Sequence, residues 1–143
     1  MKLRRGDGRP PAAALLPVRG AAPEPFGCPL EDHPQAVVVR PSGEIDLATR
    51  PLLHAALTAA VERGRHVVVD LSDVTYLDGA GFHVLLVHQR LCARRRRILA
   101  VVNARRTVRK VIDILNADQA LAVFSSMEEV LGSLEDFGCP TGE

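Results

Sequence analysis

Aromatic residues are scarce in this chain, which has no Trp and only 3% Phe, Trp and Tyr together among its 143 residues. Few ring faces are therefore available to stack on nucleic-acid bases. An excess of positive charge is missing as well, because 18 Lys and Arg residues balance 17 Asp and Glu residues. Since the chain has neither a basic excess nor many aromatic rings, its composition argues against direct binding of nucleic acid.

Cysteine is also rare, and its three copies, Cys28, Cys92 and Cys139, lie far apart in the sequence. No Cys-x-x-Cys pair or nearby His has metal-ligand spacing, so neither a disulfide framework nor a zinc site is predicted. Free thiols suit a reducing compartment, which favours a cytoplasmic location. Long apolar runs are missing too: none reaches the roughly 18 residues of a membrane span, and Ala12 to Leu16 is too short for a signal peptide.

The hydrophobic content of 47% is sufficient for one core of ordinary size. Residues 1–25 are rich in Pro, Ala and Arg without a sustained period, which predicts a flexible N-terminal arm. Residues 26–137 are predicted to form a single domain, and residues 138–143 a loose C-terminal tail.

Strands and helices alternate along the predicted domain. Strands are predicted at Ala36 to Arg40, His66 to Leu71, Ile98 to Val102 and Leu121 to Phe124. The run from His66 to Leu71 has no polar alternation, which is typical of a strand covered on both faces. A weaker edge strand, interrupted by Pro29, is expected at Phe26 to Leu30. This alternation predicts an α/β fold with a small mixed sheet, mostly parallel, and about four helices packed mainly on it.

Capping signals predict where these helices begin and end. The first is expected to begin near Thr49, with Pro51 in its first turn and Gly64 beyond its end, and the second to run from about Ala80 to Ala93. Thr107 is expected to cap the third helix, with Asn116 as a left-handed C-cap, and the sequence from Ser126 to Glu129 predicts a capping box at the start of the fourth.

The most informative segment runs from His66 to Gly81. A buried strand ends at Asp70, a short polar connection follows, and the turn Asp78-Gly79-Ala80-Gly81 opens directly into a helix. Such a turn presents backbone N–H groups at a helix start, where they can meet an anion or a partner protein. The turn contains no hydroxyl, thiol or imidazole that could act as a nucleophile, so it favours recognition over catalysis.

Other chemistries lack the groups that they need. Ser72, His83 and Asp78 are the only local set that could form a catalytic triad, and no nucleophile elbow surrounds the serine. His83 and His88 are five residues apart and so do not share a helix face at metal spacing. The turn also lacks the Lys of phosphate-binding loops. No enzymatic activity, metal or cofactor is therefore predicted.

Several motifs occur in an order that resembles a known family. They are Gly43-Glu44-Ile45-Asp46, VVVDLS with the following VTYLD, Gly79-Ala80-Gly81, and the later VVNARRTVRKVIDILNADQALAVF. Over roughly Ala36 to Leu134 the chain resembles the STAS family and, more narrowly, the bacterial anti-sigma factor antagonists. The resemblance implies a cytoplasmic protein that binds an anti-sigma factor, often a serine kinase, and so frees a sigma factor for transcription. A scaffold subunit of a signalling or transport-associated complex is the alternative.

The sequence departs from this family where phosphorylated members carry their acceptor serine. In those members the phosphate is placed on the hydroxyl one residue before the Gly of the turn, and here that residue is Ala80. A phosphate on that hydroxyl adds a charge of about −1.5 to −2 at the start of the helix. Because Ala80 has no hydroxyl to accept a phosphate, the standard switch is expected to be lost. Ser72 and Thr75 are the nearest substitute acceptors, although local hydrogen bonding is the favoured role for both.

A partner-binding surface is expected around the glycine turn and the loop at Glu44 to Asp46. The residues assigned to it are Glu44, Asp46, Asp78, Gly79, Ala80, Gly81 and Phe82. Asp78 would either contact a basic group of the partner or cap the helix, and Asp46 would either line the surface or shape its turn. The two glycines are expected to allow close approach of the partner's backbone. The weak first strand would leave an edge of the sheet exposed for pairing with another chain. A homodimer is therefore one of the arrangements that the sequence allows.

Overall fold

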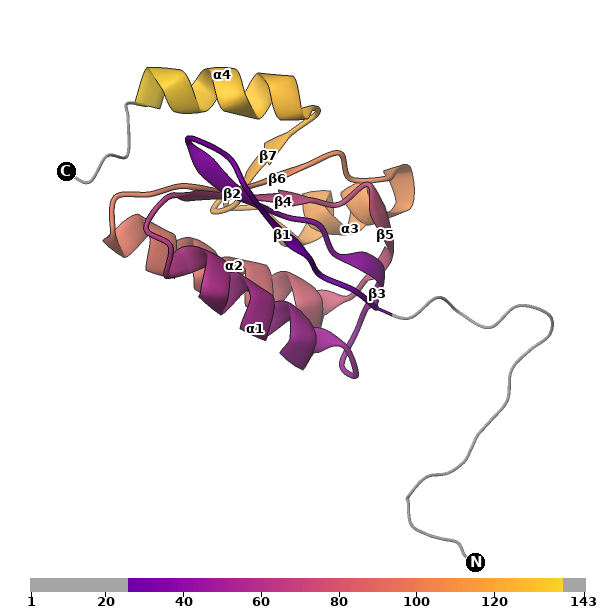
Figure 1. The fold of residues 1–143 in the computed structure, drawn as a ribbon. Helices are drawn as coiled ribbons and strands as arrows, with labels where there is room; N and C mark the ends of the chain where they lie inside the picture. Colours follow the sequence, from indigo (N-terminus) through magenta and orange to yellow (C-terminus); the bar gives the residue numbers. More distant parts are fainter. Residues whose placement is uncertain (1–25, 138–143) are drawn as a thin grey trace, which may run out of the picture.

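The computed structural model describes residues 26–137, in which a five-stranded sheet has the order β1-β2-β4-β6-β7 (Figure 1). The strands are β1 (Leu30–Asp32), β2 (Ala36–Val39), β4 (His66–Asp70), β6 (Leu99–Val102) and β7 (Ala122–Phe124). β1 pairs antiparallel with β2, and the other neighbours pair in parallel. The predicted α/β class and mostly parallel mixed sheet are confirmed, whereas the predicted arm (1–25) and tail (138–143), with Cys139, lie outside the described residues.

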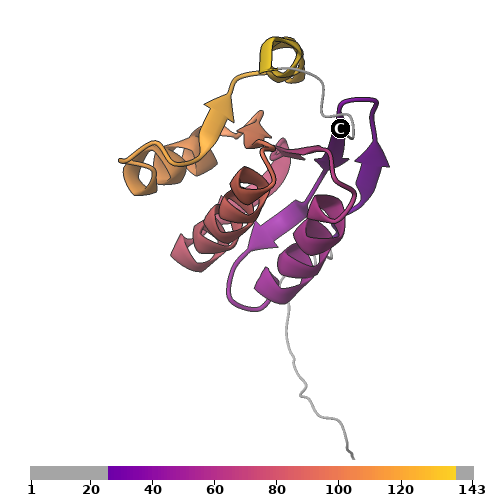
Figure 2. The same ribbon diagram turned by 90° about the vertical axis from the view of Figure 1, so that its left-hand side faces the viewer.

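Four helices cover this sheet within residues 26–137: α1 (Arg50–Val61), α2 (Gly79–Arg94), α3 (Arg106–Leu115) and α4 (Met127–Phe137). Figures 1 and 2 show α1 and α2 side by side on one face of the sheet and α4 alone on the other. None of the helices in this part of the chain is both long enough and apolar enough to cross a bilayer.

The buried strands explain why both faces need cover. Alternate residues of β2, β4 and β6 point to opposite faces, so Val37, Val67 and Val101 join the core beneath α1 and α2, whereas Val38 and Val68 join a second core beneath α4. Every residue of these three strands is buried. The predicted burial of the His66 to Leu71 strand on both faces is therefore confirmed.

Two helix starts agree with the sequence. Thr49 occupies the N-cap position of α1 and Pro51 lies in the first turn, although the Thr49 side chain makes no capping hydrogen bond to the helix. At α4, Ser126 Oγ accepts from the Glu129 amide at 3.1 Å, and Glu129 Oε1 accepts from the Ser125 amide at 2.8 Å. The capping box is confirmed, with its return bond one residue earlier than the usual motif.

Three boundary predictions are wrong. Thr107 is not a cap, because α3 begins at Arg106 after the extended residue Arg105. Asn116 has φ −100° and is not left-handed. Its side-chain Oδ1 accepts from the Leu121 amide at 3.0 Å, and its Nδ2 donates to the Leu121 carbonyl at 2.9 Å. The first strand is β1 and not Phe26 to Leu30, since Pro29 interrupts that segment and only Gly27 forms a bridge, to Ser42.

A second, two-stranded sheet was not predicted. β3 (Ser42–Ile45) pairs in parallel with β5 (Asp73–Leu77), with a register shift between Gly43 and Glu44. From the sequence, Glu44 to Asp46 were expected to form a loop, and the segment after Asp70 a short polar connection. Neither strand has a continuous apolar run, because β5 exposes three of its five residues. Its Val-Thr-Tyr sequence was the available signal, since β-branched and aromatic residues favour strands.

His88 is fully buried between α1 and α2. Its Nδ1 lies 2.9 Å from the carbonyl oxygen of Val84, which can only accept, so Nδ1 carries the proton. Nε2 of the neutral ring then accepts from the Thr58 hydroxyl at 3.1 Å, and the His54 ring packs edge-on at 4.7 Å between centroids. Burial lowers the pKa of His88, and the neighbouring His54 lowers it further.

We expect acidification to destabilise the protein through His88. The folded state disfavours the imidazolium, whereas the unfolded chain accepts a proton near pH 6.5. The free energy of unfolding, measured with urea, should therefore be highest above pH 6.5 and fall as the pH drops towards 5. His88→Asn should flatten this decline, and His83→Asn, at an exposed position of the same helix, should not. An unchanged slope in His88→Asn would contradict this assignment.

Candidate functional site

The carboxylates singled out from the sequence come together at one end of the β3-β5 pair. Ile45 lies opposite Leu77 in this parallel register, so Asp46 and Asp78 follow the ends of adjacent strands. The Asp78 amide donates to the Ile45 carbonyl at 3.3 Å, which ties the two strand ends together. Glu44 lies opposite Tyr76, one step back along the same pair. The three carboxylate residues therefore lie near the start of α2, which begins directly after Asp78.

Asp78 is the N-cap of α2. Its backbone is extended, and its Oδ1 accepts from the Gly81 amide at 2.9 Å. This bond satisfies one of the amides that a helix start leaves without an intrahelical acceptor. The capping role weighed for Asp78 is therefore confirmed, whereas its contact with a partner stays a prediction. Asp78 as a whole residue is half-buried.

Asp46 organises the loop between β3 and α1. Its Oδ1 accepts from the amides of Ala48 and Thr49 at 3.0 and 3.1 Å and lies 3.2 Å from the Thr49 hydroxyl. That hydroxyl donates to the Glu44 carbonyl at 2.7 Å and accepts from the Asp46 amide at 3.0 Å. The prediction that Asp46 shapes its turn is thus confirmed. The Thr49 hydroxyl completes the hydrogen-bond network of this loop, a role that was not predicted from the sequence.

The structure narrows the surface that the sequence assigned. Glu44 and Gly79 are exposed and Ala80 is half-buried, but Gly81 is buried and only 4% of Phe82 is exposed. Phe82 packs in the core beneath α1 and α2. A partner that docks on this structure can reach the first three residues but not the last two, because helical periodicity turns Gly81 and Phe82 inward.

Gly81 serves close packing inside the protein. A Cβ atom at this position would overlap Ile45 Cγ2 and lie 2.8 Å from Leu77 Cδ1, whereas a Cβ at Gly79 would meet no atom within 4 Å. The missing side chain lets the first turn of α2 lie directly on the ends of β3 and β5. Gly81 therefore fixes the place of the site, and Gly79 alone of the two glycines offers an open approach to the backbone.

The substitute acceptors lie away from the α2 start. Ser72 precedes β5 and Asp78 follows it, so the length of the strand, about 17 Å for 5 residues, separates them. The Ser72 amide donates to Asp70 Oδ1 at 3.0 Å, and its carbonyl accepts from Arg105 Nε at 2.8 Å. Thr75 is exposed midway along β5. A phosphate on Ser72 would not occupy the position of a phosphate on residue 80.

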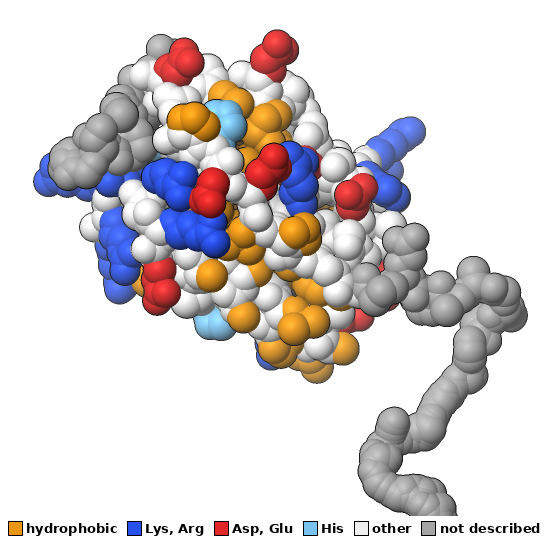
Figure 3. Space-filling view, in the orientation of Figure 1, with side chains coloured by type: hydrophobic (Ala, Val, Ile, Leu, Met, Phe, Trp, Pro, Cys, Tyr) orange, Lys and Arg blue, Asp and Glu red, His pale blue; other side chains and the backbone are white. Residues whose placement is uncertain are grey.

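Exposed apolar side chains beside the carboxylates were missed from the sequence. Leu47, in the loop that Asp46 and Thr49 organise, is 66% exposed, and Leu52, in the first turns of α1, is 55% exposed. Figure 3 shows hydrophobic side chains gathered where this loop enters α1. α1 turns Leu53 and Leu57 into the core and leaves Leu52, which precedes them, in solvent.

The two cysteines among the described residues lie outside the residues assigned to this surface. Burial raises the pKa of the Cys28 thiol to about 12 and that of Cys92 to about 11, which makes both poor nucleophiles at neutral pH. Among residues 26–137, no three His, Cys, Asp or Glu side chains are grouped so that they could hold a metal ion. The described surface is equipped for binding through charge, backbone and apolar contact.

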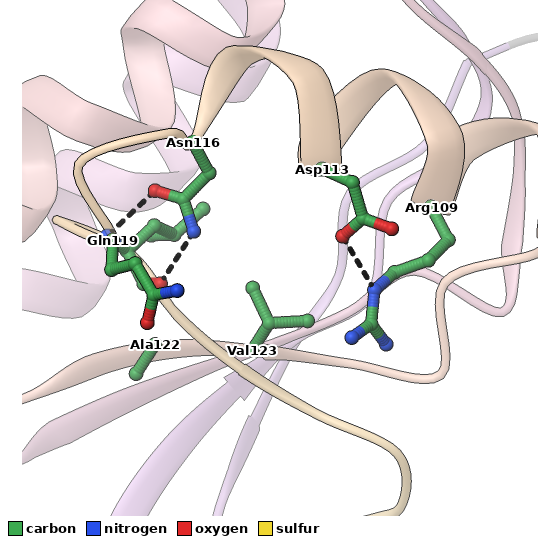
Figure 4. Close-up of a pocket in the computed structure, with 7 residues that line it drawn as sticks. Arg109, Asp113, Asn116, Gln119, Ala122 and Val123 are labelled. Atoms are coloured by element: carbon green, nitrogen blue, oxygen red, sulfur yellow. Dashed lines mark hydrogen bonds and ion pairs between the residues drawn. The ribbon is translucent and has the colours of Figure 1, made fainter.

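A separate pocket of about 450 Å³ lies between α3 and the edge strand β7 (Figure 4). Its polar side chains bond to their neighbours: Arg109 Nε lies 3.0 Å from Asp113 Oδ1, and Asn116 holds the Leu121 backbone. None of the residues assigned to the partner-binding surface lines it. We therefore place the candidate site at the β3-β5 end and the start of α2.

Comparison with known proteins identifies relatives of this chain. The anti-sigma F factor antagonist of Paenibacillus polymyxa is 24% identical over 108 residues, covering 74% of this chain and 92% of that protein. The anti-sigma-F factor antagonist RsfB of Mycobacterium tuberculosis is 27% identical over 112 residues, covering 78% and 91%. Both alignments span nearly the full length of these relatives.

Solved structures agree with the sequence comparisons. The crystal structure of an anti-sigma factor antagonist from Mycobacterium paratuberculosis superimposes with a TM-score of 0.73 at 30% identity, covering 81% of this chain and 99% of that one. Unphosphorylated SpoIIAA shares the fold with a TM-score of 0.64 at 20% identity. The family model for the STAS domain matches residues 28–130. This chain belongs to the STAS domain family.

Proposed function

We propose that this protein is an anti-sigma factor antagonist that binds an anti-sigma factor and so releases a sigma factor for transcription. The observation that carries the proposal is the acidic surface of Glu44, Asp46 and Asp78 beside the exposed start of α2, on a chain whose similar proteins are named as such antagonists. The mechanism is competition: the antagonist and the sigma factor bind the same anti-sigma factor, and no covalent step is needed.

We further propose that the interaction is constitutive, because residue 80 lacks a hydroxyl. Ala80 is half-buried in the first turn of α2, directly after Gly79 and close to the Asp78 carboxylate. A phosphate there would lie next to the Asp78 carboxylate at the docking surface, where like-charge repulsion from Asp78, the cost of desolvating the phosphate and its bulk would disfavour docking of the partner. With alanine, a kinase-type anti-sigma factor would have no acceptor at this position and could not release itself by phosphorylation.

We expect Ala80→Ser to restore the switch. The test uses purified anti-sigma factors of the source organism, each loaded with its fluorescently labelled sigma factor. Wild-type protein should displace the sigma factor with and without ATP. The serine variant should do so only without ATP, and intact-mass spectrometry should find one added phosphate on it alone. Gly79→Ser, one residue earlier in the same turn, is the matched control for the position of the hydroxyl.

The outcomes separate the parts of the proposal. Failure of the wild-type protein to bind any of the anti-sigma factors would overturn the proposed function. Phosphate on the wild-type protein, at Ser72, Thr75 or elsewhere, together with ATP-dependent release, would overturn constitutive binding alone. Stable binding to subunits of a transport or sensor complex in place of an anti-sigma factor would assign the protein a scaffold role.

A further inference from the structure

Leu47 is an apolar side chain that the fold holds out in solvent. It is 66% exposed, and Leu52 next to the same loop is 55% exposed. Isolated exposed leucines are ordinary on protein surfaces. Leu47 differs because its loop is rigid and lies beside the carboxylates of the candidate site, so its exposure cannot be relieved by a simple movement of the loop.

The rigidity of the loop comes from the hydrogen bonds of Asp46 and Thr49. Asp46 Oδ1 accepts from two loop amides, and the Thr49 hydroxyl bridges the Asp46 amide and the Glu44 carbonyl. Leu47 is the residue between the groups that these bonds connect. A residue whose backbone is fixed before binding loses less conformational entropy when a partner covers it, which strengthens the complex.

The surroundings of Leu47 have the composition of an interface centre and rim. Leu47 and Leu52 supply the apolar part, and Glu44, Asp46 and Asp78 supply carboxylates at its side. Interfaces commonly place an apolar anchor at the centre and polar groups at the rim, where complementary charges guide association. A partner that fits would present an apolar pocket bordered by Arg or Lys.

We propose that Leu47 is the apolar anchor of the antagonist interface, and that it enters a hydrophobic pocket of the anti-sigma factor with Leu52 extending the contact. This inference rests on the proposed function and names the contact residue of the same site. Asp46 and Thr49 are then positioning residues, because their hydrogen bonds hold the backbone of Leu47 in place. The carboxylates of Glu44 and Asp78 meet the basic border of the pocket.

The first test compares Leu47→Ala with Ile114→Ala by isothermal titration against the anti-sigma factor that the wild-type protein binds. Ile114 is the matched control, because it is 76% exposed but lies on α3, away from the site. Leu47→Ala should weaken binding about 30-fold, as expected when an interface hot spot is truncated. Ile114→Ala should change the affinity less than about twofold. Both variants should keep the wild-type unfolding midpoint, since neither side chain is in the core.

The second test removes the support of the loop. Thr49→Val deletes the hydroxyl with little change in shape, and it should accelerate exchange of the Ala48 and Thr49 amide protons and weaken binding about fivefold. Thr49→Ser should restore both. In the Leu47→Ala background Thr49→Val should cost no further affinity, because the residue that it positions is already missing.

The results distinguish this inference from the function on which it rests. If the wild-type protein and Leu47→Ala bind the anti-sigma factor equally well, Leu47 is not the anchor of the interface, and the proposed antagonist function is unaffected. Additive losses from Thr49→Val and Leu47→Ala would overturn the positioning role. If the wild-type protein binds no anti-sigma factor, the proposed function fails, and the anchor fails with it because its partner does not exist.

Discussion

Gly81→Val should destabilise the protein by roughly 3 kcal/mol, the upper part of the range for overpacking a well-packed position. The first atom of any side chain at residue 81 meets Ile45 and Leu77, which are themselves 0% and 2% exposed and cannot swing into solvent. Relief therefore requires α2 to move off β3 and β5. The better helix propensity of valine over glycine returns only about 0.5 kcal/mol.

Urea unfolding followed by circular dichroism measures this loss. Gly79→Ala is the matched control, because a Cβ at that position has open space and should leave stability unchanged or raise it by up to about 1 kcal/mol. Gly81→Ala should fall between the two. Full stability of Gly81→Val would show that α2 does not rest on the strand ends as described. Because it disturbs the fold, Gly81→Val cannot serve as a probe of partner binding, whereas Gly79 variants can.

The parts of the fold that the sequence predicted correctly are those with one dominant signal. β2, β4 and β6 are continuous apolar runs because both of their faces are covered, and α2 begins directly after Asp78 because this capping carboxylate precedes its apolar period. β3 and β5 lack such a signal. They form a short, half-exposed pair whose register shifts at Gly43, so no face keeps a simple alternation.

The sequence predicted most residues of the candidate site but not how the fold brings them together. Asp46 and Asp78 could be assigned to it by resemblance, but their proximity depends on the pairing of β3 with β5, which local sequence does not reveal. The helical period that predicted α2 also indicated that Phe82 is buried. Phe82 was nevertheless assigned to the partner-binding surface, which did not take that period into account. Leu47 carried no signal, because exposure of a single loop residue depends on how its neighbours bond.

Asp70→Ala should lower the free energy of unfolding by about 2 kcal/mol, since a buried charged acceptor with several partners is lost. Asp70 ends β4, and its side chain is only 6% exposed. Oδ2 receives Arg40 Nη1 at 2.6 Å, and Oδ1 receives the Ser72 amide at 3.0 Å and Asn103 Nδ2 at 3.3 Å. One carboxylate thus joins the segments that follow β2, β4 and β6 at one edge of the sheet.

The charge and the hydrogen bonds of Asp70 can be separated with Asp70→Asn. Asparagine keeps an acceptor for the Ser72 amide but loses the ion pair with Arg40, whose side chain is 42% exposed and can be hydrated instead. The Asn variant should therefore lose about half as much stability as the Ala variant. Equal losses would assign the whole effect to the ion pair. Wild-type stability in Asp70→Ala would mean that burying the carboxylate costs as much as its contacts return, so that the sheet edge is held by its backbone ladder alone.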